Sequence, residues 1–279
     1  MRIQTLADTS IVTVLNTFNE AFSDYVVPMC VSQEQLEQRI VGDSIDFNLS
    51  AGAFIEGELA GFVLFGFDII NGNKVAYNAV TGVIPSARGQ RLTTQIYEHM
   101  MPVLRTSGVK KIMLEVISTN GAAIKIYNDL GFGTVRKLLC YKGVLNVAGP
   151  HNLYTVAEFD KHDWTQLKSF WDWAPSWQNS VTSVEKSRDN NIFVGVYDGD
   201  ALIGYLVYNK VMRRVNQFAV DKGYRNKGAA ALLLNYIKDN YSPEISITNV
   251  DGDSWNTAEF LLHMGLEEYV TQQEMSLHL

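Results

Sequence analysis

The stretch LEVISTNGAAIKIYNDLGF, residues 114–132, decides how we interpret this chain. Together with the residues just before it, it begins as the apolar run KKIMLEVI (110–117), which is typical of a strand. Asn120 then precedes a helix, and Gly131 ends it because glycine is favoured just beyond a helix C-terminus. The stretch therefore predicts a strand–helix unit that carries Glu115 on the strand and Tyr127 on the helix.

A loop between a strand and a helix precedes this unit, in VIPSARGQRLTTQIY (83–97). A related loop follows Val220, where Gly228 and two alanines leave space and Arg225 adds charge. The N-terminus of a helix exposes unpaired N–H groups and a partial positive charge. Both loops therefore predict an anion site that suits a phosphate. The alternative for Arg88 and Arg225 is a salt bridge, although their position in the loops favours the anion.

The two halves of the chain look like diverged copies. Hairpins are predicted over 53–65 and 192–208, helices over 92–104 and 229–239, and strands over 110–117 and 244–250. We place the boundary near residue 146, beside the breaker Gly149-Pro150. The predicted fold is α/β of the α+β type: two tandem domains, 1–145 and 146–279, each with a mixed, mostly antiparallel twisted sheet flanked by helices.

At these residues the chain resembles the GNAT superfamily of acetyl-CoA-dependent N-acetyltransferases, in a tandem two-domain form. Arg225-x-x-Gly228-x-Ala230 matches the Gln/Arg-x-x-Gly-x-Gly/Ala loop that holds the CoA pyrophosphate in that family. The first loop departs from this pattern, with Arg91 and Thr93 at the small positions. The second motif of the family matches residues 114–132, in register at Asn120, Ala123, Ile126, Tyr127, Gly131 and Phe132. Leu261 stands at the equivalent tyrosine position of the second half.

The resemblance implies transfer of an acetyl group from acetyl-CoA, a co-substrate, to a primary amine of a small molecule. The transfer is expected to be direct, within a ternary complex. Glu115 is either the general base or a structural carboxylate, Tyr127 either protonates the CoA thiolate or is a core residue, and Asn120 is either a cofactor ligand or a turn residue. The predicted cofactor-binding residues are Thr81, Gly82 and Val83 for the pantetheine amides, Arg88, Gly89, Gln90, Arg91, Leu92 and Thr93 for the pyrophosphate, Asn120, and Val220, Arg225, Asn226, Lys227, Gly228, Ala229 and Ala230 in the second half.

The composition excludes several other classes of protein. The 279 residues hold 23 basic and 30 acidic side chains, so a nucleic-acid-binding protein is not expected. The longest apolar stretch, 59–67, is too short to cross a membrane. Two cysteines form neither a disulfide framework nor a cysteine-rich metal site, and no metal is predicted. With no apolar signal core at the N-terminus, we expect a cytoplasmic protein. The oligomeric state stays open.

We expect the first half to carry the turnover, because it combines Glu115 and Tyr127. The tryptophans at 171, 173 and 177 either line an acceptor pocket or belong to the core. Two other classes of function compete with the enzyme: a CoA-binding sensor or regulator without turnover, and a structural tandem scaffold.

Overall fold

The computed structural model describes residues 1–24, 30–146 and 154–279, and the predicted breaker Gly149-Pro150 lies outside these ranges. The chain forms two compact units, residues 1–135 with 273–279 and residues 136–272. Of the helices in the described ranges, none is both long and apolar enough to cross a bilayer.

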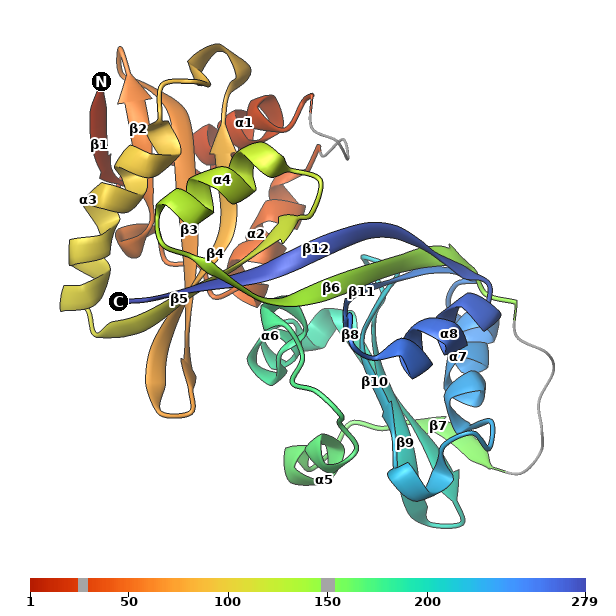
Figure 1. Ribbon diagram of the computed structural model, residues 1–279. Helices are drawn as coiled ribbons and strands as arrows, with labels where there is room; N and C mark the ends of the chain where they lie inside the picture. Colours follow the sequence, from red (N-terminus) through yellow and green to blue (C-terminus); the bar gives the residue numbers. More distant parts are fainter. Residues whose placement is uncertain (25–29, 147–153) are drawn as a thin grey trace. The chain divides into compact units, whose positions relative to one another are not determined.

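The first unit is a sheet with helices on both faces (Figure 1). Its strands lie in the order β1-β2-β3-β4-β5-β12, where β4 and β5 are parallel and the pairs from β1 to β4 are antiparallel. The elements are β1 (Arg2–Thr5), α1 (Ile11–Ala21), α2 (Gln33–Gly42), η1 (Phe47–Leu49), β2 (Ala51–Ile55), β3 (Glu58–Ile70), β4 (Asn73–Val83), η2 (Pro85–Ala87), α3 (Leu92–Thr106), β5 (Val109–Ile117) and α4 (Gly121–Asp129).

Strand alternation separates two apolar layers in this unit. Phe62 on β3 faces α1, where it stacks on Phe18. Val63 and Phe65 face the opposite way and pack in the core beneath α3 and α4. The helix α2 begins at a capping box formed by Ser32 and Gln35. Each face of the sheet therefore has its own helices.

The second unit repeats this plan with the strand order β12-β6-β11-β10-β9-β8-β7. Its β10 and β11 are parallel, as β4 and β5 are, and α7 and α8 pack on one face while α5 and α6 belong to the other. The elements are β6 (Gly133–Val144), β7 (Thr155–Glu158), α5 (Trp164–Ser169), η3 (Trp177–Asn179), α6 (Val181–Lys186), η4 (Arg188–Asn190), β8 (Asn191–Asp198), β9 (Ala201–Asn209), β10 (Arg214–Val220), η5 (Lys222–Tyr224), α7 (Ala229–Asn240), β11 (Glu244–Asp251), α8 (Trp255–His263) and β12 (Leu266–His278).

The units differ from the predicted domains 1–145 and 146–279 by an exchange of strands. From Arg136 onward β6 belongs to the second unit, where it pairs antiparallel with β11. Residues 273–279 return to the first unit, and the backbone N–H of Leu279 donates to the carbonyl oxygen of Lys110 on β5 at 3.0 Å. Both strands follow equivalent helices, α4 and α8, so the sequence repeat alone predicts the simpler division.

Candidate functional site

In each unit the two parallel strands pair over only part of their length, and we call the region beyond their last paired residues the fork. In the first unit β4 pairs with β5 as far as Asn78 and Leu114, and β4 then continues to Val83. In the second, β10 pairs with β11 at Arg214 and Val215 and continues to Val220. Register shifts in the neighbouring antiparallel pairs make Ala79 and Asn216 the extra residues of β-bulges at the base of each fork. Ligands of open α/β sheets bind at such strand ends.

The loops that follow β4 and β10 have the same backbone path. Gly89 and Asn226 are left-handed, with φ of 79° and 59°, and so are Arg91 and Gly228, with φ of 59° and 87°. The helices α3 and α7 begin directly after Arg91 and Gly228. A non-glycine residue in this conformation costs about 1 kcal/mol. The first loop therefore keeps the same backbone path at Arg91 although its side chain makes that path unfavourable. An added Cβ on Gly228 would meet no atom within 4 Å, which leaves its helix N-terminus open.

The side chains of Arg88 and Arg225 hold these loops to the rest of their own units. Arg88 donates to the carbonyl oxygens of Val83 at 3.3 Å and Ala21 at 2.9 Å, and makes a bidentate ion pair with Asp24, both contacts at 2.7 Å. Because the guanidinium bonds the Asp24 carboxylate, it lowers the pKa of that group. Ala21 is the last residue of α1, where a cation is favoured by the helix dipole.

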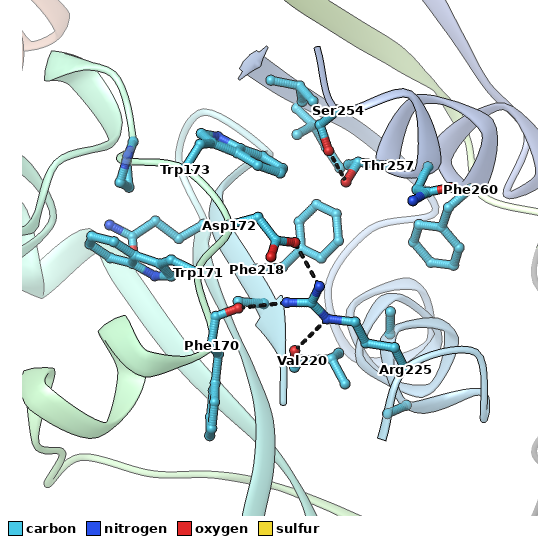
Figure 2. Close-up of a pocket in the computed structure, with 18 of the residues that line it drawn as sticks. Phe170, Trp171, Asp172, Trp173, Phe218, Val220, Arg225, Ser254, Thr257 and Phe260 are labelled. Atoms are coloured by element: carbon cyan, nitrogen blue, oxygen red, sulfur yellow. Dashed lines mark hydrogen bonds and ion pairs between the residues drawn. The ribbon is translucent and has the colours of Figure 1, made fainter. Parts of the chain in front are cut away.

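Arg225 repeats this arrangement in the second unit, as Figure 2 shows. It donates to the carbonyl oxygens of Val220 at 3.1 Å and Phe170 at 2.9 Å, and to the Asp172 carboxylate at 2.7 Å. Phe170 is the C-cap of α5. We call the Arg88 and Arg225 contacts the arginine clamps. The sequence predicted that both side chains contact an anion, but each guanidinium is engaged with protein groups, because carbonyl oxygens and a carboxylate lie within its reach.

A cavity of about 590 Å³ opens between the fork and the loop of the second unit. Aromatic side chains of Trp171, Trp173, Phe218 and Phe260 lie around it, with the clamp pair at its edge (Figure 2). Asn179 bridges the two strands of the fork: its backbone oxygen accepts from Gln217 Nε2 at 2.5 Å, and its Nδ2 donates to the Thr248 carbonyl oxygen at 2.8 Å. The cavity includes these predicted cofactor-binding residues: Val220, Arg225, Asn226, Gly228, Ala229 and Ala230.

The base of the fork in the first unit holds a buried polar cluster on the α3 and α4 face. The Asn78 Nδ2 lies 2.7 Å from the Tyr97 hydroxyl, 2.8 Å from Thr81 Oγ1 and 3.3 Å from the Tyr127 hydroxyl. Thr81 Oγ1 also donates to Asn78 Oδ1 at 3.1 Å. Burial, and then the neighbouring Tyr127, raise the pKa of Tyr97 well above its usual range, so this hydroxyl stays protonated. We call Asn78, Thr81, Tyr97 and Tyr127 the amide cluster.

Glu115 lies on the opposite face of the same fork. It alternates with Leu114 and Val116, whose side chains are in the core beneath α3 and α4. The hydroxyl of Tyr77 on β4 donates to Glu115 Oε2 at 3.2 Å, and burial followed by this carboxylate raises the pKa of Tyr77 well above its usual range. Arg39 of α2 donates to the carbonyl oxygen of the bulged Ala79 at 2.8 Å. The fork is thus flanked by Tyr127 on one face and Glu115 on the other.

Comparison with known proteins decides the family. The model of the Acetyltransferase (GNAT) family matches residues 12–132 and 153–252, most of both units. The chain belongs to the GNAT acetyltransferase family. Over 82 residues it is 29% identical to N-alpha-acetyltransferase 30 of Schizosaccharomyces pombe, and this alignment spans 29% of the chain and 55% of that protein. The chain thus spans about half the length of this relative.

Two solved GNAT structures share the fold of this chain. A GCN5-related N-acetyltransferase from Sphaerobacter thermophilus has a TM-score of 0.74 at 14% identity, covering 99% of this chain and 95% of its own. A tandem GNAT protein from the clavulanic acid biosynthesis pathway has a TM-score of 0.72 at 13% identity, covering 99% and 98%. The predicted fold class, two tandem GNAT-like domains with mixed sheets, is confirmed.

Several predicted residues of the GNAT motifs have structural contacts. Asn120 is the N-cap of α4, and its side chain accepts from the Ala123 N–H at 3.1 Å, which fits a turn residue before a helix. Lys227 donates to the Gly223 carbonyl oxygen at 2.8 Å. Trp171 and Trp173 line the cavity, whereas Trp177 is buried.

The sequence interpretation missed Tyr77, Asn78 and Tyr97 in the first unit, and Asn179 and Gln217 in the second. Asn78 gave a signal, because it is a polar residue within the apolar strand AYNAV. The contacts of the other four join elements that are distant in the sequence.

Proposed function

We propose that this GNAT protein transfers the acetyl group of acetyl-CoA to the primary amine of a small molecule, and that the transfer takes place in the first unit. The observation that carries the proposal is the position of Glu115 and Tyr127 on opposite faces of one open fork. A thioester in the fork then has a proton acceptor on the side of α1 and α2 and a proton donor on the side of α3 and α4.

The residues present fit acetyl-CoA. Beyond Asn78 the backbone of Thr81 to Val83 continues as the edge of the fork, where strand N–H and C=O groups suit the pantetheine amides. At the start of α3, the first N–H groups have no intrahelical acceptor, and they suit the pyrophosphate. Because Arg88 is engaged in its clamp, we assign the phosphate to the backbone of residues 88–93 and not to that guanidinium.

The chemistry needs a base and an acid. An alkylammonium acceptor has a pKa near 10.4 and must lose a proton before its nitrogen attacks the thioester carbon. Glu115, directly or through water, takes that proton. As the C–N bond forms and the C–S bond breaks, Tyr127 donates its proton to the departing thiolate. The nitrogen, now bonded to the acetyl carbon, releases its second proton to water, and Tyr127 regains a proton from water. The net charge of −7 favours the approach of a cationic acceptor, and the two free cysteines fit a cytoplasmic location.

The test is thiol release by the full chain with acetyl-CoA and a panel of small primary amines. We expect at least one amine to be acetylated, and turnover to fall at least tenfold in both Glu115→Gln and Tyr127→Phe. Tyr269, an exposed residue of the second unit, supplies the control, because Tyr269→Phe removes a hydroxyl outside the unit that holds Glu115 and Tyr127. If no amine releases thiol, or if neither variant changes turnover, the proposal fails.

The cavity favours a second function for the second unit: it binds CoA without turnover, as a sensor would. Its loop is open at Gly228, but Leu261, which is fully buried, stands where Tyr127 stands in the first unit. Titration of CoA into Tyr127→Phe tests this function. We expect two binding events per chain, of which one is lost in Gly228→Glu.

A further inference from the structure

We infer that Asn78 is a positioning residue that orients the proton of Tyr127 toward the fork and stabilises the phenolate left after the proton is transferred. This inference rests on the proposed function, because it gives Tyr127 the role of acid. Nothing in the GNAT sequence motifs points to Asn78. The inference depends instead on the donors and acceptors of the amide cluster.

Asn78 Nδ2 is the donor in each of its contacts, because an amide nitrogen cannot accept a hydrogen bond. An asparagine Nδ2 carries two hydrogens, and its Oδ1 only accepts. Three hydroxyl oxygens lie within reach of Nδ2: Tyr97 at 2.7 Å, Thr81 at 2.8 Å and Tyr127 at 3.3 Å. When Thr81 donates to Oδ1 at 3.1 Å, the two Nδ2 hydrogens go to the hydroxyl oxygens of Tyr97 and Tyr127. A phenol oxygen that accepts from Asn78 must direct its own hydrogen elsewhere. The amide nitrogen therefore cannot receive the Tyr127 proton, and we infer that this proton is directed toward the fork.

The Asn78 amide also stabilises Tyr127 after the proton has been transferred. When Tyr127 has given its proton to the thiolate, its oxygen is negative and lies beside an N–H donor inside the core. A hydrogen bond to the charged form of a group stabilises that form. Tyr97 cannot share the charge, because burial keeps its own hydroxyl protonated. The contact between Asn78 and Tyr127 therefore strengthens as the proton leaves.

The second unit shows that the fold does not require this cluster. The two units can be aligned at the ends of their strands, Val83 and Val220. In this alignment the counterparts of Asn78, Thr81 and Tyr97 are Val215, Phe218 and Leu234. Counted from Gly131 and Gly265, Leu261 corresponds to Tyr127. All four counterparts are apolar, and Val215, Leu234 and Leu261 are fully buried. Burying polar groups is unfavourable unless each is paired. Because an apolar set supports the same strands and helices, the polar set in the first unit serves another purpose.

The experiment compares Asn78→Val, Asn78→Asp and Tyr205→Phe in the full chain. Asn78→Val copies the second unit, and Asn78→Asp keeps the shape but replaces the donor by an acceptor. Tyr205 is the matched control, because its buried hydroxyl also contacts an amide, Gln217 Oε1 at 2.8 Å, but in the other unit. We expect both Asn78 variants to lower kcat about tenfold or more with little change in the KM for acetyl-CoA. We also expect Asn78→Val to move the alkaline limb of the kcat profile to higher pH. Tyr205→Phe should do neither.

A spectroscopic readout separates this inference from the proposed function. In protein labelled with 13C at tyrosine Cζ, the resonance missing from Tyr127→Phe identifies Tyr127. We expect that resonance to shift in Asn78→Val and to keep its position in Tyr205→Phe. An unchanged resonance, or an unchanged kcat profile in an active enzyme, overturns the role of Asn78. If the resonance shifts but the wild type acetylates no amine, the contact stands and the proposed function fails.

Discussion

Replacing Arg225 by alanine removes one clamp and tests whether its carbonyl contacts or its ion pair matter more. The side chains of Arg225 and Asp172 are 33% and 48% exposed, and a pair this exposed contributes at most about 1 kcal/mol. The two carbonyl contacts, to Val220 and Phe170, are charge-assisted, and such bonds contribute about 1.5–3 kcal/mol before solvent screening. We therefore expect Arg225→Ala to lower the free energy of unfolding by about 2 kcal/mol and Asp172→Ala by less than about 1 kcal/mol.

The assay is urea unfolding followed by tryptophan fluorescence. All five tryptophans lie between residues 164 and 255, so their signal reports the second unit alone. The equivalent variant Arg88→Ala is the matched control, because it removes the clamp of the first unit and should leave the tryptophan transition unchanged. The double variant Arg225→Ala with Asp172→Ala completes a thermodynamic cycle, in which the coupling should not exceed about 1 kcal/mol. A cost of Asp172→Ala equal to that of Arg225→Ala would refute the view that the carbonyl contacts dominate.

Three further outcomes follow from the site. Gly228→Glu should abolish CoA binding by the second unit, measured by calorimetry, while first-unit turnover stays largely intact; Gly199→Glu, also at a positive φ with open space, is its control. Arg88 lowers the pKa of Asp24 in the folded protein below the value of about 3.9 for an unfolded chain. The ion pair therefore stabilises the fold fully above about pH 3.9, and this stabilisation is lost as the pH falls through the pKa of Asp24 in the folded protein. The difference in melting temperature between wild type and Asp24→Asn should therefore be constant from about pH 5 to 8 and shrink below about pH 4. Leu261→Tyr should not give the second unit turnover, because Val215, Phe218 and Leu234 provide no polar cluster around the new hydroxyl.

The sequence predicted the two hairpins, the helices α3 and α7 and the strands β5 and β11 closely, because local patterns determine these elements. The capping box at Ser32, the glycines that end α4 and α8, and the alternation in the hairpins all act within a few residues. The exchange of the last strands was not predictable in this way, because β6 and β12 follow equivalent helices and either could close either sheet.

The candidate site was predictable only in part for the same reason. The motif spacing predicted Glu115 and Tyr127 as candidate site residues, and the structure places them on opposite faces of the fork. Their partners could not be predicted, because Asn78 reaches Tyr127 across 49 positions of the sequence. The arginines of the loops were predicted to contact an anion because the sequence pattern shows their position in the loop. The pattern does not show the carbonyl groups at the ends of α1 and α5, which accept hydrogen bonds from these arginines.

The pair of full-length variants Tyr127→Phe and Gly228→Glu, assayed for thiol release with one accepted amine, tests most directly whether the first unit carries the chemistry. We expect Tyr127→Phe to lower turnover by roughly one to three decades and to keep acetyl-CoA binding, because a positioned acid contributes about 10²–10⁴-fold. Gly228→Glu should leave turnover largely intact. Loss of turnover in Gly228→Glu with normal turnover in Tyr127→Phe would contradict this assignment and place the active centre in the second unit.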